Sequence, residues 1–372
     1  FNFAGADFLY LVSKAGGKGN DGRKYKGLKK EEQDMDNMKQ DKEYYVERYE
    51  DRFFWDTPEN LKLYPYGARD GWKKYEGNPV LGREYGTCFD ISVLEDEGIY
   101  KMWFSWRAHK CIAYTESKDG ISWTEPIEVL GPNPDSGWDK DELNRPSVIK
   151  KDGIYKMWYS GQMDPYKNEG RSCIGYAQSI DGIHWERFSE PVMVPEQTWE
   201  QKAIMCPHVI YEEDKQMYKM WYSGGGNHEP DAIGYGESKD GIHWKKYNQN
   251  PIMENRPDIP WERDKVAACH VLKWDGYYYM FYIGFIHVDR AAIGLARSKD
   301  GVTEWERYPL NPILAPDKEG FDQKAVYKPY VLKKETGWLL WYNGAMYMDN
   351  PDEIVKEQIG AAFLERENLW NV

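Results

Sequence analysis

Apolar and polar residues alternate in short segments along most of the chain, and the same segments recur. The clearest copies are GIYKMWFS at 98–105, GIYKMWYSG at 153–161 and MYKMWYSGG at 217–225, with weaker copies at 277–284 and 338–344. Alternation with a period of two is typical of β-strands that bury one face. We therefore predict a strand at each copy and an internal repeat of about 60 residues.

Each of the first four copies is followed by a second apolar segment and then by an Asp-Gly turn. The turns, such as KDGISW and IDGIHW, end in Trp123, Trp185, Trp244 and Trp305. A segment with a β-branched run, such as PSVIKK, precedes each copy, and a fourth segment, such as WKKYNQNPIM, follows the turn. Asp-Gly turns between alternating segments favour antiparallel meanders over βαβ units. Repeated four-stranded units are typical of propeller blades, so we predict an all-β β-propeller.

The number of inner-strand copies predicts five blades. The last unit has no DGxxW segment after IGAAFLE, whereas residues 70–81, DGWKKYEGNPVL, match the outer-strand segment DGIHWKKYNQNPIM of the third unit. We therefore expect an N-terminal strand at 70–82 to complete the last blade and close the ring. Residues 1–69 are expected to form a charged arm with a short helix near 29–50. The five blades are expected, in chain order, at 83–133, 134–197, 198–255, 256–316 and 317–372.

The composition indicates a globular protein and narrows its ligands. The chain has 372 residues, 30% of them charged, and a formal net charge of −13, which disfavours binding to nucleic acids and anionic lipids. No apolar run reaches the roughly 18 residues that a membrane-spanning helix needs. The five cysteines show no CxxC pair, which favours free buried thiols over disulfides or structural zinc. Aromatic residues make up 16% and suit both sheet faces and the apolar face of a sugar ring.

In a propeller the innermost strands converge on a central channel, and their equivalent positions face one concavity. Aligning these strands places five residues in one ring: Asp90, Arg145, Cys206, Ala268 and Lys328. A second ring two positions further along holds Ser92, Ser147, His208, His270 and Tyr330. A packed plug explains the cysteine and the alanine of the first ring. One acid among two cations instead indicates a functional charge group.

The loops between the second and third strands bring further polar residues toward the same face. Together with residues of the rings, they make up the predicted substrate-binding set: Arg107, His109, Asn144, Arg145, Gln162, His208, His228, His287, Lys328 and Asn343. Imidazole, guanidinium and amide groups in this number indicate a polyhydroxylated or anionic ligand. The four histidines of the set are spread over three blades without the short spacing of metal ligands, so neither a metal nor a cofactor is expected.

The repeat pattern YKMWYSG…IGYAxSxDGIxWxx…NPIL, with five blades and an N-terminal clasp, resembles the five-bladed propeller glycosidases over residues 70–365. These comprise the family 43 arabinanases and xylosidases, the invertase and levansucrase group, and the mannoside phosphorylases of family 130. The resemblance implies an enzyme that cleaves a glycosidic bond in an oligosaccharide or polysaccharide, with a hydrolase expected ahead of a phosphorylase. The Ser-x-Asp-Gly-x-x-Trp turns are also similar to sialidase Asp boxes, but they are one residue shorter.

In family 43 and the invertase group, the catalytic carboxylates are an Asp entering blade one, a supporting Asp entering blade two and a Glu entering blade three. Asp90 in GTCFDISV matches the first position, which implies a role as general base or nucleophile. The other positions depart: Arg145 stands before Pro146 in ELNRPSVI, and Met205 stands two residues before Pro207 in IMCPHVI. The Asp-Pro-Arg motif of the mannoside phosphorylases is absent as well.

These departures leave two functions open. In the first, the chain is a carbohydrate-active enzyme in which a loop carboxylate, Glu229 ahead of Glu142 or Asp164, serves as the acid opposite Asp90. In the second, it is a non-hydrolytic glycan-binding propeller whose cations and histidines hold a sugar acid or a sugar phosphate. The enzyme is the preferred interpretation, because the superfamily is mainly catalytic. The sequence determines neither the sugar and its linkage, nor the oligomeric state, nor the compartment.

Overall fold

The computed structural model describes residues 57–164, 170–226, 230–287, 290–346 and 357–371. The expected helix near 29–50 lies outside these residues, as do the predicted site residues His228 and Glu229. In the described part, the fold is all-β, as the sequence predicts. Its helical pieces are one short α-helix, α3 (Pro58–Leu61), and four single-turn 3-10 helices: η1 (Arg83–Tyr85), η2 (Arg107–His109), η3 (Thr198–Glu200) and η4 (Pro260–Glu262).

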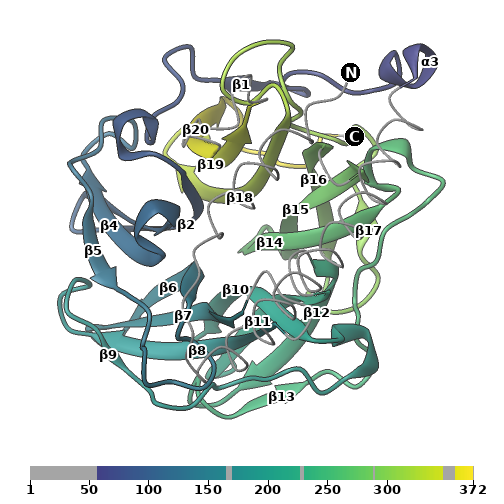
Figure 1. The fold of residues 1–372 in the computed structure, drawn as a ribbon. Coiled ribbons are helices and arrows are strands. Elements are labelled where there is room, and N and C mark those ends of the chain that lie inside the picture. The colour runs from purple at the N-terminus through teal and green to yellow at the C-terminus, as the bar shows by residue number, and fades with distance from the viewer. Residues whose placement is uncertain (1–56, 165–169, 227–229, 288–289, 347–356, 372) are drawn as a thin grey trace, which may run out of the picture. The chain divides into compact units, whose positions relative to one another are not determined.

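The twenty strands of the described residues form five antiparallel groups of four, numbered here in chain order (Figure 1). Groups one and two are β2 (Cys88–Asp96), β3 (Ile99–Trp106), β4 (Cys111–Ser117) and β5 (Ile127–Leu130), then β6 (Glu142–Lys151), β7 (Ile154–Met163), β8 (Arg171–Ser179) and β9 (Glu186–Arg187). Groups three and four are β10 (Ala203–Glu212), β11 (Met217–Gly225), β12 (Pro230–Ser238) and β13 (Trp244–Lys246), then β14 (Lys265–Trp274), β15 (Tyr277–His287), β16 (Arg290–Ser298) and β17 (Glu306–Arg307). Group five combines β18 (Ala325–Lys334), β19 (Gly337–Ala345) and β20 (Glu357–Leu364) with β1 (Trp72–Lys74).

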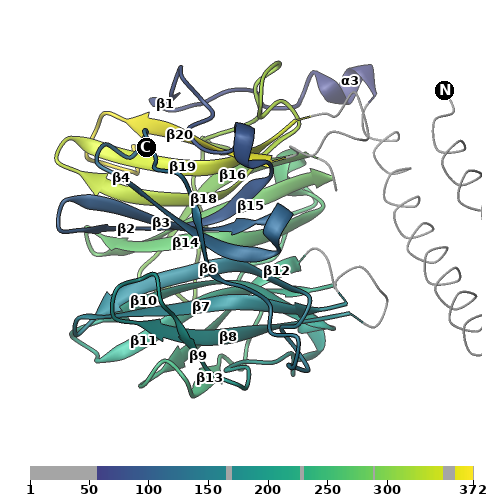
Figure 2. The same cartoon turned by 60° about the vertical axis from the view of Figure 1, so that its left-hand side comes forward.

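Hydrogen bonding divides these strands into four sheets. A single bridge between Ala203 and Ser172 links groups two and three, which run alongside each other in Figure 2, into one eight-stranded sheet. None of the sheets closes on itself within the described residues. The groups meet instead through their first strands, which lie toward the middle of Figure 1. Contacts join β2 to β6, β6 to β10, β10 to β14, β14 to β18, and β18 to β2.

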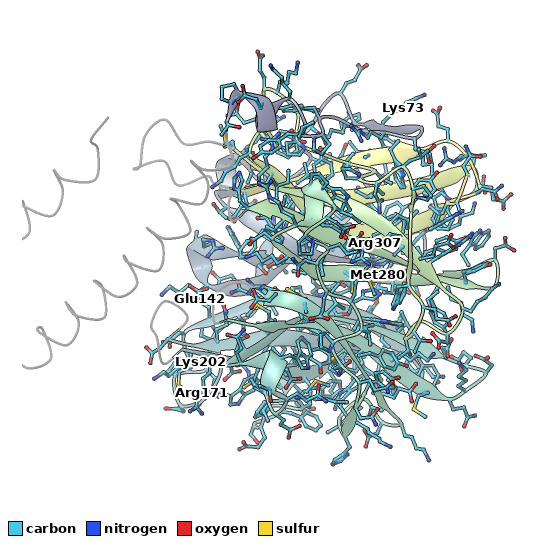
Figure 3. The ribbon with its side chains drawn as sticks, turned by 90° about the vertical axis from the view of Figure 1, so that its right-hand side faces the viewer. Lys73, Glu142, Arg171, Lys202, Met280 and Arg307 are labelled. Atoms are coloured by element: carbon cyan, nitrogen blue, oxygen red, sulfur yellow. The ribbon has the colours of Figure 1, made fainter. Side chains whose placement is uncertain are left out.

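The segment before group one joins the C-terminal strands. In β1, Trp72 pairs with Leu364 of β20, and Lys74 pairs with Ala362. The Asn78 side chain extends this link, since its Nδ2 donates to the Ala361 carbonyl (2.9 Å) and its Oδ1 accepts from the Ala361 N–H (2.8 Å). β1 is therefore the outer strand of group five, and Figure 3 shows Lys73 at this outer edge.

Four of the five boundaries between groups share one hydrogen bond. In each, the indole N–H of a buried tryptophan on the second strand donates, over 2.8 Å, to the carbonyl of a turn glycine in the next group. The pairs are Trp103–Gly182, Trp158–Gly241, Trp221–Gly301 and Trp341–Gly120. The turn requires glycine, because φ is +82° at Gly182, where a Cβ would be strained. At the remaining boundary, the ring of Phe281 meets Trp72 edge-on.

A second repeated feature, which we call the acid clamp, lies inside groups two to five. In each clamp a buried acid accepts a hydrogen bond from a tyrosine hydroxyl of the second strand and pairs with a cation of the outer strand. The clamps are Asp139–Tyr159–Arg187, Glu200–Tyr222–Lys246, Glu262–Tyr282–Arg307 and Asp322–Tyr342–Lys74. The last lysine lies on β1, so this clamp ties the N-terminal strand to the end of the chain. Group one has Phe104 at the tyrosine position.

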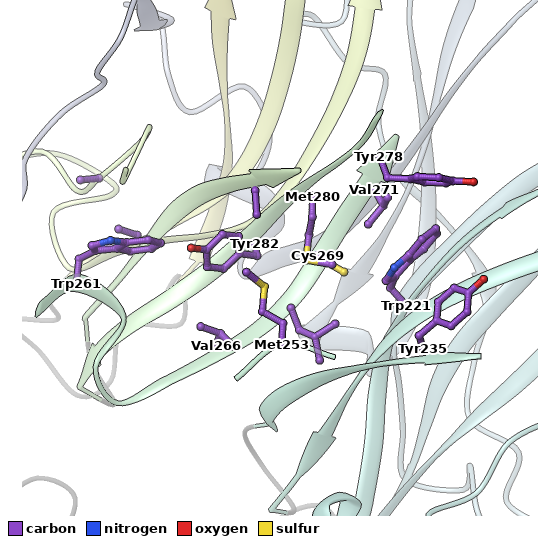
Figure 4. Packing of buried hydrophobic residues seen from close by; sticks show 14 of the residues in the cluster. Trp221, Tyr235, Met253, Trp261, Val266, Cys269, Val271, Tyr278, Met280 and Tyr282 are labelled. Atoms are coloured by element: carbon purple, nitrogen blue, oxygen red, sulfur yellow. The ribbon is translucent and has the colours of Figure 1, made fainter. Parts of the chain in front are cut away.

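Apolar and aromatic side chains fill the space between neighbouring groups. Figure 4 shows one such cluster, in which Trp221 and Tyr235 of group three pack against Val271, Tyr278 and Met280 of group four. Trp221 and Met280 are fully buried, as expected of a close-packed interior. All five cysteines are free and buried, which confirms the sequence prediction. Within the described ranges, no helix has the length and apolar character needed to cross a bilayer.

Candidate functional site

The five ring positions aligned from the sequence are equivalent in the structure. At each one a bulge interrupts the pairing of the first strand, and bulges re-aim side chains and lie next to many active sites. The residue there has a positive φ in every case: Asp90 (+54°), Arg145 (+59°), Cys206 (+54°), Ala268 (+29°) and Lys328 (+48°). Residues with a Cβ rarely adopt this conformation, and such strain gathers at functional sites. The fold thus holds five unlike side chains in one constrained geometry.

Serine hydroxyls fix the backbone at three of these bulges. The N–H of the ring residue donates to a serine of the preceding group over 2.8 to 3.1 Å, in the pairs Arg145–Ser105, Cys206–Ser160 and Ala268–Ser223. The equivalent position in group five is Asn343, which pairs with Tyr327 across the strands. Asn343 is fully buried, and its side-chain nitrogen and oxygen have no hydrogen-bond partner among the described residues. Unpaired buried amides are costly, which marks Asn343 as a candidate ligand contact.

Electrostatic interactions connect four of the ring residues: Asp90, Arg145, Cys206 and Lys328. Asp90 Oδ2 lies 3.4 Å from Arg145 Nε. Burial lowers the pKa of the Arg145 guanidinium, but neighbouring charges led by Asp90 outweigh this effect and raise it above its usual value. Burial raises the pKa of the Cys206 thiol, although Lys328 and Arg145 oppose that shift. The thiol is therefore neutral, and the charges of the ring are one carboxylate and two cations.

Lys328 is a buried cation. Its residue is only 4% exposed, and within the described residues its ammonium group makes no hydrogen bond or ion pair. Desolvating an unpaired charge is expensive, so a buried ammonium group of this kind favours an anionic partner. Arg145 adds a second donor, because its Nη1 is buried and also lacks a hydrogen bond in that part of the chain. The ring is therefore suited to bind an anion beside Asp90.

Arg107 and Glu357 form an ion pair beside the ring. Arg107 Nε lies 3.6 Å from Glu357 Oε2, and the guanidinium stacks 4.4 Å above the ring of Phe89, the residue before Asp90. Burial raises the pKa of the Tyr327 hydroxyl well above its usual value, and the charges of Glu357 and then Asp90 raise it further. Tyr327 thus lies near both carboxylates. Sequence reasoning included Arg107 but missed Glu357 and Tyr327; the position of Tyr327 directly before Lys328 was the available signal.

Asn144 and Gln162 of group two form a hydrogen-bonded set near the start of β6. Asn144 Nδ2 donates to Gln162 Oε1 (2.7 Å) and to Glu142 Oε2 (3.1 Å). All three side chains are buried. Figure 3 shows Glu142 on the same side of the protein as Arg171 and Lys202, which lie at the start of β8 and just before β10. The structure therefore places the predicted residues Asn144 and Gln162 together, and Asn144 directly precedes Arg145 on β6. The Asp164 N–H, further along, donates to Asp141 (2.7 Å).

Three predicted histidines have contacts of their own. His208 Nε2 lies 2.7 Å from the Val271 carbonyl, and burial lowers its pKa to about 3, so the ring is neutral and joins two strands. His109 is exposed, pairs with Glu128 of β5, and has its ring centre 3.9 Å from that of Trp106. His287 is buried with its ring centre 6.3 Å from that of Tyr64. In the described ranges, no three His, Cys, Asp or Glu residues are grouped to hold a metal ion.

A comparison with protein-family models assigns the chain to a family. The model of glycoside hydrolase family 130, described as beta-1,4-mannooligosaccharide phosphorylase, matches residues 163–371, more than half of the chain. The chain belongs to family 130. Of the three glycosidase groups that the sequence resembles, this is the mannoside phosphorylase group. Cys206, Ala268 and Lys328 lie inside the matched segment of this family 130 protein, whereas Asp90 and Arg145 precede it.

Individual relatives and solved structures are similar to parts of the chain. An uncharacterized protein of Mycobacterium tuberculosis is 30% identical over 160 residues, which is 42% of this chain and 51% of that protein, so the chain spans about half of its length. A 1,2-beta-oligomannan phosphorylase of Thermoanaerobacter sp. is 26% identical over 246 residues, 64% of this chain and 75% of that enzyme. A thermostable family-43 glycoside hydrolase shares the fold, with a TM-score of 0.62, 20% identity, and coverage of 80% of this chain and 92% of the other.

Proposed function

We propose that this family 130 chain cleaves a glycosidic bond in a mannooligosaccharide by transferring the sugar to inorganic phosphate. This replaces the hydrolysis that the sequence favoured. The observation that carries the proposal is the make-up of the ring, in which Asp90 lies beside Arg145 and the buried Lys328. The relatedness to a 1,2-beta-oligomannan phosphorylase supports the sugar and the reaction type.

The side chains at the ring positions are the chemical argument for phosphorolysis. Hydrolysis uses two carboxyl groups, one to protonate the leaving oxygen and one to activate water or attack the sugar. This chain has Arg145 and Met205 where related glycosidases carry the other acids. In phosphorolysis an oxygen of hydrogen phosphate attacks the anomeric carbon and the bond to the glycosidic oxygen breaks. The glycosidic oxygen takes up a proton that the Asp90 carboxylate accepts from hydrogen phosphate and passes on. One carboxyl group and a cationic phosphate site then suffice.

The proposed roles follow from charge and position. Lys328 and Arg145 bind the phosphate, since charge-assisted hydrogen bonds from these groups suit its oxygens. Asn144, Gln162 and Asn343 are proposed to bind sugar hydroxyls, together with Arg107. His109, His208 and His287 stay predictions as further sugar contacts, and so do two residues outside the described ranges, His228 and Glu229.

We further propose that the five groups are blades of a closed five-bladed propeller, with the ring residues around its axis. The successive contacts of the first strands, which return from β18 to β2, support this arrangement. The pairing of β1 with β20 and the Trp341–Gly120 hydrogen bond support closure between the last and first groups. The proposed site would then lie where all five blades meet.

A product assay tests the proposed function. The protein is incubated with β-1,2- and β-1,4-mannobiose, with and without inorganic phosphate, and the products are separated by chromatography. We expect a sugar phosphate and free mannose to form in equal amounts, and only with phosphate. Lys328→Met should raise the KM for phosphate about tenfold or more without lowering the melting temperature, because the substitution removes a buried unpaired charge. Mannose release independent of phosphate would establish a hydrolase instead.

A glycan-binding protein without catalytic activity is the second candidate. The Asp90–Arg145 ion pair favours it, since a carboxylate neutralised by a neighbouring guanidinium can serve as a fixed binding group. The same assay separates the two candidates. Absence of any product, with mannobiose still raising the melting temperature, would support binding over catalysis.

A further inference from the structure

We propose that Glu357, held by Arg107, is a specificity-determining residue that binds the sugar ring next to Asp90. This inference rests on the proposed function and assigns a residue to the sugar side of the same site. Glu357 is the first residue of β20 in group five, and Arg107 begins η2 in group one. The Arg107–Glu357 ion pair therefore connects group one with group five, beside the ring residues.

The geometry leaves the Glu357 carboxylate able to accept a hydrogen bond from a ligand. The 3.6 Å between Arg107 Nε and Glu357 Oε2 exceeds the length of an N–H···O hydrogen bond. Glu357 Oε2 is buried and makes no hydrogen bond of good geometry in the described part of the chain, and the Tyr327 hydroxyl lies close enough that an interaction with the Glu357 side chain helps to raise the Tyr327 pKa. The two side chains are 36% and 21% exposed, whereas Asp90 is 6% exposed, so the pair lies nearer to solvent than the acid of the ring. A ligand that approaches Asp90 from solvent is expected to meet this pair first.

The charge of Glu357 acts on two further groups. Its charge, after burial, is the largest electrostatic influence that raises the pKa of Tyr327, and Asp90 follows. Burial raises the pKa of the Cys88 thiol to about 12, and Cys111 and then Glu357 contribute to that shift. Tyr327 directly precedes Lys328, and Cys88 lies two residues before Asp90. Glu357 thus lies close to both strands that supply the charged ring residues.

The chemistry of the pair indicates the ligand class. A carboxylate accepts hydrogen bonds from two neighbouring hydroxyls, and a guanidinium donates to their oxygens, so together they match a vicinal diol of a pyranose. Arg145 and Lys328 have the opposite preference, for an anion. Phosphate would therefore bind to Arg145 and Lys328 on one side of Asp90, and the sugar would bind to Glu357 and Arg107 on the other side. A sugar whose hydroxyls point differently would lose one of the two hydrogen bonds to Glu357.

Binding without turnover tests the inference. Titration calorimetry measures β-1,2-mannobiose in the absence of phosphate, and phosphate in the absence of sugar, for the wild type, Glu357→Gln and Glu365→Gln. Glu365 is the matched control, because it lies in the same group and pairs with Lys73 at an exposed edge. We expect Glu357→Gln to weaken mannobiose binding about tenfold or more and to change phosphate binding less than twofold. Glu365→Gln should change neither.

The outcomes separate this inference from the proposed function. Unchanged affinity for mannobiose in Glu357→Gln would overturn the inference. Equal losses of affinity for mannobiose and for phosphate, with a lowered melting temperature, would overturn it as well. A wild type that binds no mannobiose would overturn it too. A wild type that binds mannobiose through Glu357 but forms no sugar phosphate would overturn the proposed function alone. Sophorose, the β-1,2-linked glucose disaccharide, serves as the epimer control, and we expect Glu357→Gln to reduce the ratio of the affinity for mannobiose to the affinity for sophorose.

Discussion

The acid clamps and the ring positions both recur from group to group. The clamps share a set of interacting side chains, whereas the ring positions share a backbone geometry. The four clamps repeat a chemistry, since each holds an acid between a tyrosine hydroxyl and a cation. The ring repeats a backbone geometry, a bulge with positive φ, and fills it with aspartate, arginine, cysteine, alanine and lysine. Uniform chemistry is what a scaffold needs, because each copy stabilises the same contact. Uniform geometry with divergent side chains is what a binding site needs.

The two regions also differ in the partners of their polar groups. Every clamp acid has both a phenol and a cation as partners, as for Asp322 with Tyr342 and Lys74, although Asp139 Oδ1 and Glu262 Oε1 make no hydrogen bond in the described ranges. In the ring, Asp90 Oδ2 makes no hydrogen bond there, and the Asn343 amide has no hydrogen-bond partner at either of its atoms. A buried amide without any partner costs stability and is kept where a ligand completes its hydrogen bonds. Substitutions in the clamps should therefore affect stability, and substitutions in the ring should affect activity.

The largest expected effect is that of Asp90→Asn. Asparagine tolerates the left-handed conformation and keeps the size of the side chain, but it cannot transfer the proton. We expect the rate of sugar phosphate formation to fall between about 10²-fold and 10⁴-fold, the usual contribution of a general acid or base. Initial rates at saturating mannobiose and phosphate measure it. A rate within tenfold of the wild type would remove Asp90 from the mechanism.

Asp322→Asn should produce the largest loss of stability. The substitution removes the charge that faces Lys74 at 2.7 Å, in a clamp where the acid side chain is 2% exposed. Breaking a buried ion pair costs about 3 to 5 kcal/mol, and we expect roughly 2 to 3 kcal/mol here because Asp317 also lies 3.1 Å from Lys74. Urea unfolding measures the loss. Lys73→Gln, at an exposed pair one residue away, is the control and should cost less than about 0.5 kcal/mol.

His208 should make stability depend on pH. Burial lowers its native pKa to about 3, whereas the unfolded chain has the ordinary value near 6.5. Between these values the unfolded state binds a proton that the native state does not, so this stability is complete above pH 6.5 and falls as the pH decreases toward 3. The slope is at most about 1.4 kcal/mol per pH unit. In His208→Asn, unfolding free energies at pH 5 and 7.5 should differ less than in the wild type; an equal difference would contradict the assignment.

The smallest effect is expected at the neutral ring position. Ala268→Gly relieves the positive φ but adds freedom to the unfolded chain, so the net change should lie within about 1 kcal/mol of zero. Catalytic rates should stay within twofold. Ala267→Gly is the matched control on the same strand, and it should destabilise more because Ala267 has no positive φ to relieve. Equal losses at the two positions would show that the bulge at Ala268 stores no strain.

The sequence predicted the repeated parts of the fold well, for physical reasons. Period-two alternation and Asp-Gly turns are local signals, so the inner strands and their ring positions could be aligned without a structure. The match of residues 70–81 to an outer strand points to the segment that contains β1, in which Trp72 pairs with Leu364 of β20. Blade number and closure stay proposals, because propeller blades meet by packing and the hydrogen bonding of the described residues, which forms four open sheets, tests neither.

The site was less predictable, because it depends on where side chains turn after the backbone is placed. Polar residue type alone put His208 in the substrate-binding set; its Nε2 lies 2.7 Å from the Val271 carbonyl, and its contact with a sugar stays a prediction. Glu357 follows a segment without repeat signals, and its approach to Arg107 brings together residues 250 positions apart in the chain. Such long-range contacts leave no pattern in a single sequence. Only their geometry reveals the second carboxylate near the ring.

The contrast between clamp and ring is tested most directly by comparing catalytic rate and melting temperature in one clamp variant and one ring variant. The rate of sugar phosphate formation per folded molecule is followed by phosphorus NMR for Asp90→Asn and Asp322→Asn, with the melting temperature taken on the same samples. We predict that Asp90→Asn loses at least about 100-fold in rate while keeping the higher melting temperature of the two. Asp322→Asn should melt earlier and keep its rate within about threefold. An active Asp90→Asn, or an inactive but folded Asp322→Asn, would contradict the assignment of chemistry to the ring.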